Sequence, residues 1–200
     1  MPKKRRSLKK KKNLNIWIEG TIIAALATVL SLIPFNIGPS FSVTVGAPVM
    51  LLYCLRRGLV PGFFASFLWG VLHILIGTAY ILTPLQGFIE YFIAFGFTGL
   101  AGLFTPKVQQ AIADQNKKML LWNVFIGTVV GTVGRYFWHT IAGYYFWGSY
   151  APEGWSAWLY SITLNGASAL ATGAFTIMVL AVIAKTNPQL YVPKKAVRGY

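Results

Sequence analysis

The segment Gly134-Arg135-Tyr136-Phe137-Trp138-His139 places a guanidinium and an imidazole one helical turn apart inside a long apolar run. An aromatic stretch follows, Gly143-Tyr144-Tyr145-Phe146-Trp147, and then Tyr160 and Asn165. Polar groups in such surroundings carry a desolvation cost that requires a partner. Aromatic faces beside them could hold a planar or cationic molecule. The stretch therefore predicts half of a pocket for a small, aromatic, positively charged ligand, with Glu90 as the main contribution from the other half.

The composition of the whole chain is that of a membrane protein. Of the 200 residues, 56% are hydrophobic and only 11% are charged, whereas soluble domains carry about 25% charged residues. The single cysteine, Cys54, excludes an internal disulfide and is expected to be a small core residue. These features place the chain in the class of integral membrane proteins.

The net charge of +14 is concentrated near the N-terminus, where eight of the eighteen basic residues lie between Lys3 and Lys12. The segment has no apolar face, so we expect residues 1–15 to form a basic, disordered tail. Such a basic run can also mark a nucleic-acid-binding protein. Because a membrane span begins a few residues later, we interpret it as the cytoplasmic flank of that span. Membrane lipid is therefore an expected partner, and nucleic acid is not.

Six apolar runs are candidates for membrane-spanning helices, which need about 20 apolar residues each, or fewer within a bundle. We expect an all-α integral membrane protein with six transmembrane helices. They form one membrane domain, residues 16–185, and a cytoplasmic C-terminal tail follows at residues 186–200. The expected helices are 17–33, 43–55, 59–80, 85–104, 119–142 and 158–184.

The basic residues alternate between the connections, and cytoplasmic loops are enriched in Lys and Arg. The loops 35–42 and 78–83 carry no charge, and the loop 143–157 carries only Glu153. The other connections and both terminal segments are basic. The alternation predicts that both termini are cytoplasmic and that the loops lacking basic residues face outward.

The first expected helix carries small residues at four-residue spacing, namely Gly20, Ala24 and Thr28. Such a stripe lets another helix approach closely. The approaching helix could belong to this chain or to a partner subunit, and the sequence leaves both alternatives open. The stripe is therefore a candidate partner interface.

Glu90 is the only acidic residue inside an expected span away from its cytoplasmic end. A buried carboxylate requires a cation, several donors or a proton. Glu90 could therefore face a cationic ligand, or form an ion pair with Arg135 that ties two helices together. A histidine such as His139, taken alone, is more often a packing residue with a hydrogen-bond partner. Its expected depth in the membrane is the same as that of Glu90 and Asn165, which favours contact with a ligand. His73 has no acidic neighbour in the sequence and is interpreted as a packing residue.

The other residues at this level also have two interpretations. Trp147 could stack on a ligand or belong to an interfacial aromatic belt. Asn165 offers an acceptor and a donor that suit the edge of a heterocycle, and an interhelical hydrogen bond is the alternative. Trp69, Tyr80 and Tyr91 fall at the same expected depth on the outer side.

Motifs of several enzyme classes are absent from the sequence. There is no Gly-x-x-x-x-Gly-Lys-Ser/Thr phosphate loop, so the chain should not hydrolyse ATP. No His-Glu-x-x-His motif or Cys/His cluster indicates a metal site, and no nucleophilic Ser or Cys lies in a recognisable elbow. We expect no cofactor, no metal and no enzymatic activity.

In their order along the chain, these residues resemble the ThiT (YuaJ) family, the thiamine-specific substrate-binding S components of energy-coupling-factor transporters. The resemblance covers roughly residues 20–184. Its specific part comprises Glu90-Tyr91, the run from Arg135 to His139, Trp147, and Tyr160 with Asn165.

The resemblance implies a six-helix protein of the bacterial plasma membrane with a high-affinity thiamine pocket near the outer face. The loop between the first two helices would cap this pocket. The carried-over roles are a stack of Trp147 on the aminopyrimidine ring, a thiazolium contact by Glu90, and a coupling stripe on the first helix. Asn165, Tyr160 and His139 would hydrogen-bond the ligand, and Tyr91, Trp69 and Tyr80 would line the pocket. Arg135 would belong to the pocket only if Glu90 lies between it and the ligand, because two positive charges repel each other.

The resulting hypothesis is a subunit that captures thiamine from outside and does not pump alone. Its partners would be an energy-coupling module made of a transmembrane coupling subunit and two cytoplasmic ATPases. One alternative is a stand-alone ion-coupled carrier for a cationic aromatic solute. Another is a membrane enzyme that uses Glu90 and His139 as an acid/base pair.

Overall fold

The helices follow the apolar runs of the sequence, as seen in a computed structural model that describes residues 2–33, 35–37 and 41–193. They are α1 (Pro2–Ser31), α2 (Ala47–Arg57), α3 (Leu59–Leu75), α4 (Pro84–Gly87), α5 (Phe95–Phe97), α6 (Thr105–Ala113), α7 (Lys117–Trp147) and α8 (Ala157–Thr186). The π-helical η1 (Phe88–Ala94) and the 3₁₀-helical η2 (Thr98–Phe104), η3 (Gly148–Tyr150) and η4 (Pro188–Tyr191) complete the helical elements. Between α1 and α2, β1 (Asn36–Ile37) pairs antiparallel with β2 (Phe41–Ser42). The expected all-α fold class is confirmed.

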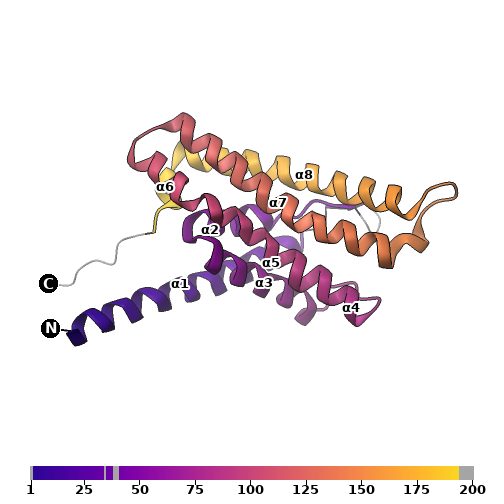
Figure 1. Cartoon of the computed structure of the whole chain (residues 1–200), viewed down its shortest axis with the longest axis horizontal. Coiled ribbons are helices and arrows are strands. Elements are labelled where there is room, and N and C mark those ends of the chain that lie inside the picture. Colours follow the sequence, from indigo (N-terminus) through magenta and orange to yellow (C-terminus); the bar gives the residue numbers. More distant parts are fainter. Residues whose placement is uncertain (1, 34, 38–40, 194–200) are drawn as a thin grey trace.

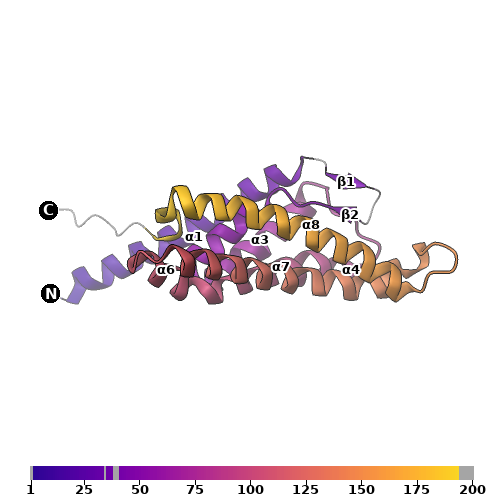
Figure 2. The ribbon, with the colours of Figure 1, turned by 90° about the horizontal axis from the view of Figure 1, so that it is seen from above.

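The helices form an elongated bundle in which α7 and α8 run side by side along its length (Figure 1 and Figure 2). The segments α4, η1, α5, η2 and α6 follow one another without a break and pack against α3 and α7. The start of α1 and the end of α8 lie at the same end of the bundle (Figure 1). We call it the basic end, because Arg56, Arg57, Lys117 and Lys185 lie there.

Four helical segments are long and apolar enough to span a membrane: 14–31, 84–113, 117–150 and 157–186. The helix α3 is apolar but has 17 residues, and α2 has only 11. At 1.5 Å per residue, α2 covers about half of a hydrocarbon core of about 30 Å. The expected helical segments are thus present in the expected order, and six complete spans stay a prediction.

Polar side chains fix where three helices begin. Thr83 accepts a hydrogen bond from the backbone N–H of Gln86 before α4, and Asn116 accepts one from Met119 before α7. Ser156 does the same for α8. Each such cap satisfies a backbone donor that has no partner within the helix.

Several element boundaries differ from those expected. The helix α1 begins at Pro2 and so includes the basic segment that we expected to be disordered; Lys, Arg and Leu are good helix formers that extend a helix nucleated by the apolar span. The expected helix 85–104 does not end before Thr105-Pro106. The continuous run from α4 to α6, which we call the central helix, extends to Ala113 because proline suits the first turn of α6. The aromatic stretch after Gly143 is the last part of α7 rather than a loop. Of the expected C-terminal tail, residues 188–191 form η4, and residues 194–200 lie outside the described part of the chain.

The small-residue stripe of α1 faces the inside of this chain. Gly20, Ala24 and Thr28 are buried, and a side chain at Gly20 would meet the hydroxyl of Tyr53 at 2.7 Å and the Cβ of Ala65 at 3.4 Å. Tyr53 belongs to α2 and Ala65 to α3. The stripe therefore packs against helices of its own chain, which was one of the two alternatives left open by the sequence. It is not available to a partner subunit in this structure.

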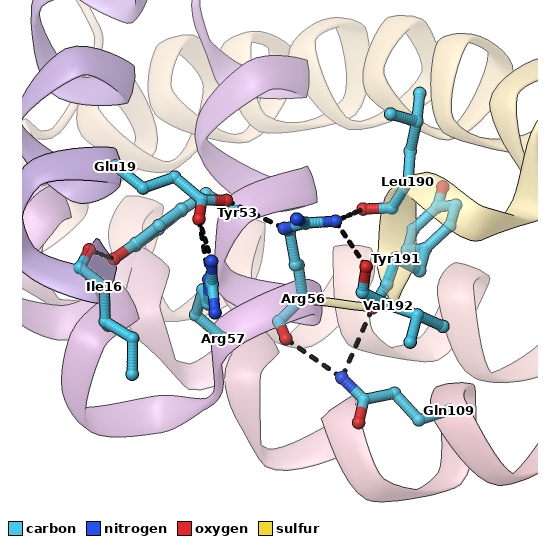
Figure 3. A network of polar contacts seen from close by, with 9 residues as sticks. All are labelled: Ile16, Glu19, Tyr53, Arg56, Arg57, Gln109, Leu190, Tyr191 and Val192. Carbon is cyan, nitrogen blue, oxygen red and sulfur yellow. Dashed lines mark hydrogen bonds and ion pairs between the residues drawn. The ribbon is translucent and has the colours of Figure 1, made fainter. Parts of the chain in front are cut away.

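A network of polar contacts joins α1, α2 and the segment after α8 at the basic end (Figure 3). Arg56 donates through Nε to Glu19 at 2.7 Å, and Arg57 forms an ion pair with the same carboxylate. Arg56 Nη1 also donates to the carbonyl oxygens of Leu190 and Val192, at 2.8 and 2.6 Å. The guanidinium of Arg56 thus holds the end of the described chain against α1 and α2.

The same network reaches α6 and the middle of α1 (Figure 3). Gln109 Nε2 donates to the carbonyl oxygens of Arg56 and Tyr191, at 3.0 and 3.3 Å. Tyr53 donates its hydroxyl proton to the carbonyl oxygen of Ile16 at 2.7 Å. Burial raises the pKa of the Tyr191 hydroxyl, so this group stays a hydrogen-bond donor.

Candidate functional site

At the end of the bundle opposite the basic end, the helices enclose a cavity of about 350 Å³. Its walls come from the end of α1, the segment 42–44, the end of α3, η1, α7 and α8. Eight of the nine ligand-binding residues predicted from the sequence line it: Tyr80, Glu90, Tyr91, Arg135, His139, Trp147, Tyr160 and Asn165. Residues far apart in the sequence are therefore gathered around one space.

Trp69 is the predicted residue that does not line the cavity. Its side chain is 0% exposed, and its ring packs edge-on against Phe95 at a centroid distance of 4.9 Å. The guanidinium carbon of Arg135 lies over the Trp69 ring, 4.8 Å from its centroid. Trp69 therefore supports the wall of the cavity from behind, because Arg135 and Phe95 stand between it and the space.

Glu90 and Trp147 contact each other across the cavity. The indole Nε1 of Trp147 donates a hydrogen bond to Glu90 Oε1 at 2.9 Å. The second carboxylate oxygen lies 4.0 Å from His139 Nδ1. Only 9% of Glu90 is exposed. The carboxylate is thus oriented by neutral or weakly basic groups, which leave its negative charge available to a bound cation.

Arg135 contacts aromatic rings and His139 rather than Glu90. Its guanidinium carbon lies 4.0 Å from the centroid of Phe95 and 5.6 Å from that of Tyr136, and its Nε lies 3.4 Å from His139 Nε2. No ion pair between Arg135 and Glu90 is present in the described part of the chain. The structure therefore does not show Glu90 and Arg135 as an ion pair that only joins two helices. Cation–π contacts stabilise the guanidinium instead.

A local irregularity in the central helix presents Glu90 and Tyr91 to the cavity. Both lie in η1, where the helix widens to π-helical geometry, a feature that is frequent at functional sites. The carbonyl oxygen of Tyr91 lies so close to Gly70 of α3 that a Cβ at Gly70 would overlap it. Gly70 therefore permits the close approach of α3 that this wider turn requires.

The segment between α1 and α2 covers the cavity from the side of α8. Ser42 N–H donates to Ser168 Oγ at 3.1 Å, and Thr44 N–H donates to Thr172 Oγ1 at 3.1 Å. The Tyr136 hydroxyl lies 3.0 Å from Thr172 Oγ1. In Figure 2, β2 packs against α8 and β1 pairs with β2. The described part of the expected capping loop thus borders the cavity and is fastened to α8; residues 34 and 38–40 lie outside the description.

The connection between α3 and α4 forms another part of the rim. Tyr80 is 68% exposed, and its backbone N–H donates to the Tyr91 hydroxyl at 2.9 Å. The buried side chain of Gln86 donates to the carbonyl oxygen of Tyr80 at 3.1 Å and accepts from Leu82 N–H at 3.0 Å. Gln86 therefore holds this short connection in place beside the cavity.

Sequence reasoning missed several lining residues. His73, which we interpreted as a packing residue, lines the cavity, and its Nδ1 lies 2.9 Å from Thr78 Oγ1. Tyr136 lies within the quoted motif, one position from Arg135, so the motif itself could have indicated it. Phe95 gave no signal, because only tertiary packing brings it to the cavity. The segment 42–44 lies at the end of the connection that we expected to cap the pocket, but none of its residues was predicted individually.

The chemistry of the cavity is that of binding. One buried carboxylate, a guanidinium packed on aromatic rings, two imidazoles, several aromatic faces and amide or hydroxyl groups surround the space. Within the described residues, no three His, Cys, Asp or Glu side chains gather as metal ligands would. A planar organic cation satisfies this set of groups, since the carboxylate and the rings both favour positive charge.

Comparisons with known proteins agree on one family. The thiamine transporter protein (Thia_YuaJ) family matches residues 17–192. Thiamine transporter ThiT of Lacticaseibacillus paracasei is 42% identical over 187 residues, which cover 92% of this chain and 93% of that protein. Thiamine transporter ThiT of Bacillus subtilis is 30% identical over 188 residues, covering 92% and 98%. A solved structure of ThiT from Listeria monocytogenes superposes with a TM-score of 0.89 at 44% identity, covering 91% of this chain and all of that one.

Proposed function

This chain belongs to the thiamine transporter protein (Thia_YuaJ) family, and from that premise we propose that its cavity binds one thiamine molecule for uptake. The chain is a multi-pass protein of the bacterial plasma membrane and is a transport protein rather than an enzyme. By the distribution of Lys and Arg, the basic end is cytoplasmic and the cavity opens toward the outside. Thiamine would therefore enter the cavity from outside the cell.

The observation that carries the proposal is the buried carboxylate of Glu90 held by Trp147 inside an aromatic cavity. Thiamine carries a permanent positive charge on its thiazolium ring, which no change of pH removes. A site for it needs negative charge or π-electron density in a place shielded from water. Glu90 supplies the charge, and Arg135 packs on Phe95 and Trp69 instead of forming an ion pair with it.

The proposed roles of the lining residues follow from their chemistry. Trp147 stacks on a ring of thiamine, and Glu90 faces the thiazolium. Asn165, Tyr160 and His139 hydrogen-bond the ligand. Tyr91 and Tyr80 close the space around it, and Trp69 acts indirectly through Arg135.

The energetic terms are large enough for tight binding. A desolvated cation–π contact contributes about 2 kcal/mol or more, and an aromatic stack contributes about 0.5–1.5 kcal/mol. Satisfied hydrogen bonds and shape complementarity add to these terms. After the costs of association, their sum is compatible with nanomolar affinity, about −12 kcal/mol.

Transport would require partners, since the sequence lacks a nucleotide-binding loop. We propose that an energy-coupling module, made of a transmembrane coupling subunit and two cytoplasmic ATPases, drives uptake. Because Gly20, Ala24 and Thr28 are occupied within the chain, the partner would contact the exposed face of α1. The small residue Ala25 lies on this face, flanked by the exposed Ile18, Ile22 and Val29.

The decisive experiment is calorimetric titration of the detergent-purified chain with thiamine. Saturable binding at one thiamine per chain supports the proposed function, and no heat of binding overturns it. Vesicles containing only this chain then distinguish a dependent subunit from a stand-alone carrier. They should show no thiamine uptake under a proton or sodium gradient, and uptake under either gradient would favour the carrier.

A further inference from the structure

We propose that Ser161 is a positioning residue that fixes the orientation of the Asn165 amide, so that the site selects an amino group over an oxo group on the ligand's pyrimidine ring. This inference rests on the proposed thiamine binding and specifies how the heterocycle is recognised. It concerns Ser161, whose contacts with Asn165 decide which end of the amide faces the cavity, and Gly143, whose lack of a side chain leaves room for these contacts.

The orientation follows from the hydrogen bonds around Ser161. Its hydroxyl proton is donated to the carbonyl oxygen of Thr140, in α7, at 2.7 Å. The Ser161 Oγ can then only accept from its other neighbour, and the Ser161 carbonyl oxygen is always an acceptor. Asn165 Nδ2 lies 3.1 Å from that carbonyl oxygen and 3.3 Å from Ser161 Oγ. Because both neighbouring atoms of Ser161 are acceptors, the amide nitrogen of Asn165 must face Ser161. The amide oxygen of Asn165 must then point away from Ser161.

Through Ser161, the orientation of the Asn165 amide depends on both α7 and α8. It is buried at the contact between α7 and α8, with 1% of its surface exposed. Gly143 of α7 leaves the space that the arrangement needs: a Cβ there would overlap Ser161 Oγ and lie 2.9 Å from Asn165 Nδ2. The absence of a side chain at Gly143 thus allows Ser161 and Asn165 to meet.

With this orientation, Asn165 requires a hydrogen-bond donor on the ligand. Asn165 lines the cavity, and with its nitrogen held by Ser161 it presents the amide oxygen as an acceptor. The aminopyrimidine of thiamine carries an exocyclic amino group, which donates hydrogen bonds. Oxythiamine carries an oxygen at this position, which would face the amide oxygen and lose the bond. Sites that hydrogen-bond a substrate group discriminate strongly against an analogue that leaves the site unpaired.

The test compares binding of thiamine and oxythiamine by calorimetry in the wild type and in Ser161→Ala. The substitution removes one of the two acceptors that hold the amide nitrogen, so reversal of the amide costs less. We expect the preference for thiamine over oxythiamine to fall by about three- to tenfold. Thr163→Ala removes a hydroxyl from an exposed position of the same helix and should leave the preference unchanged.

A second variant pair tests the same inference through packing. Gly143→Ala should displace Ser161 and Asn165 and reduce the preference further. Gly166→Ala adds the same methyl group next to Asn165, where the methyl group would extend into open space, and should have no effect. A purely steric loss in Gly143→Ala would weaken both ligands equally.

The outcomes separate the two proposals. If the wild type does not bind thiamine, the proposed function fails. If the wild type binds thiamine but Ser161→Ala and Gly143→Ala keep the wild-type preference, the positioning role of Ser161 is wrong and the proposed function stands. Thermal unfolding of each variant without ligand checks that it is folded before the ratio is interpreted.

Discussion

Glu90 and Trp147, 57 residues apart in the sequence, meet through a hydrogen bond of 2.9 Å from the indole nitrogen to a carboxylate oxygen. The bond joins the π-helical segment of the central helix to the end of α7. It orients a carboxylate without neutralising it. The two residues that we assign to the thiazolium and to ring stacking are therefore linked directly to each other.

Glu90→Gln should weaken thiamine binding by more than tenfold, or about 1.4 kcal/mol or more. The amide oxygen of glutamine can still accept from Trp147, so the cavity keeps its shape and loses only the negative charge. Calorimetry measures the affinity. Glu153→Gln removes an exposed acidic charge outside the cavity and should bind as the wild type does. Equal affinity in Glu90→Gln and the wild type would mean that Glu90 is only structural.

Trp147→Ala should reduce the affinity and abolish the quenching of tryptophan fluorescence by thiamine. The indole provides the stacking surface, which contributes about 0.5–1.5 kcal/mol, and also the donor to Glu90. Trp155→Ala is the control, because Trp155 is half-exposed in the loop before α8 and does not line the cavity. Quenching that survives in Trp147→Ala would assign Trp147 to the interfacial belt.

Gly70→Ala should lower both stability and affinity, because the added Cβ would overlap the carbonyl oxygen of Tyr91. Overpacking of this kind costs about 1–3 kcal/mol, and the displaced turn carries Glu90. Gly173→Ala is the matched control, since its Cβ would meet Thr132 Cγ2 at an ordinary 3.6 Å. Thermal unfolding and thiamine titration measure the two effects. A stable Gly70→Ala variant with wild-type affinity would show that the π-helical turn does not depend on this contact.

Arg56→Ala should lower the free energy of unfolding by about 2–4 kcal/mol. Hydrogen bonds to charged groups contribute about 1.5–3 kcal/mol each, but solvent reaches these partly exposed bonds and makes the total smaller than their sum. The variant loses the bonds to Glu19, Leu190 and Val192 (Figure 3). Thiamine affinity should stay within about twofold of the wild type, because the network lies at the opposite end from the cavity. Lys107→Ala removes an exposed basic charge and should change neither quantity. A large loss of affinity in Arg56→Ala would reveal coupling between the two ends.

The position of most helices was predictable from the sequence, because apolar runs of sufficient length leave few alternatives in a membrane. Their ends were less predictable. Pro106 falls in the first turn of α6, where a proline is tolerated, and so does not stop the helix. The residues from Gly143 to Trp147 stay helical because α7 continues to pack against α8.

The small-residue stripe of α1 shows what the sequence leaves open. The spacing of Gly20, Ala24 and Thr28 predicted a close helix contact, and such a contact exists. Spacing alone does not say which helix makes it. The packing of α2 and α3 against this stripe identified the neighbour as the chain itself.

By itself, the sequence determined that this is a membrane protein with one isolated intramembrane carboxylate among aromatic residues, because composition and hydropathy dictate where each side chain can be solvated. Only the tertiary structure decided which residues share the cavity. It placed His73 at the cavity and Trp69 behind Arg135. The physical reason is that helix rotation and the π-helical turn depend on contacts between distant segments, such as Gly70 with Tyr91, which no local pattern encodes.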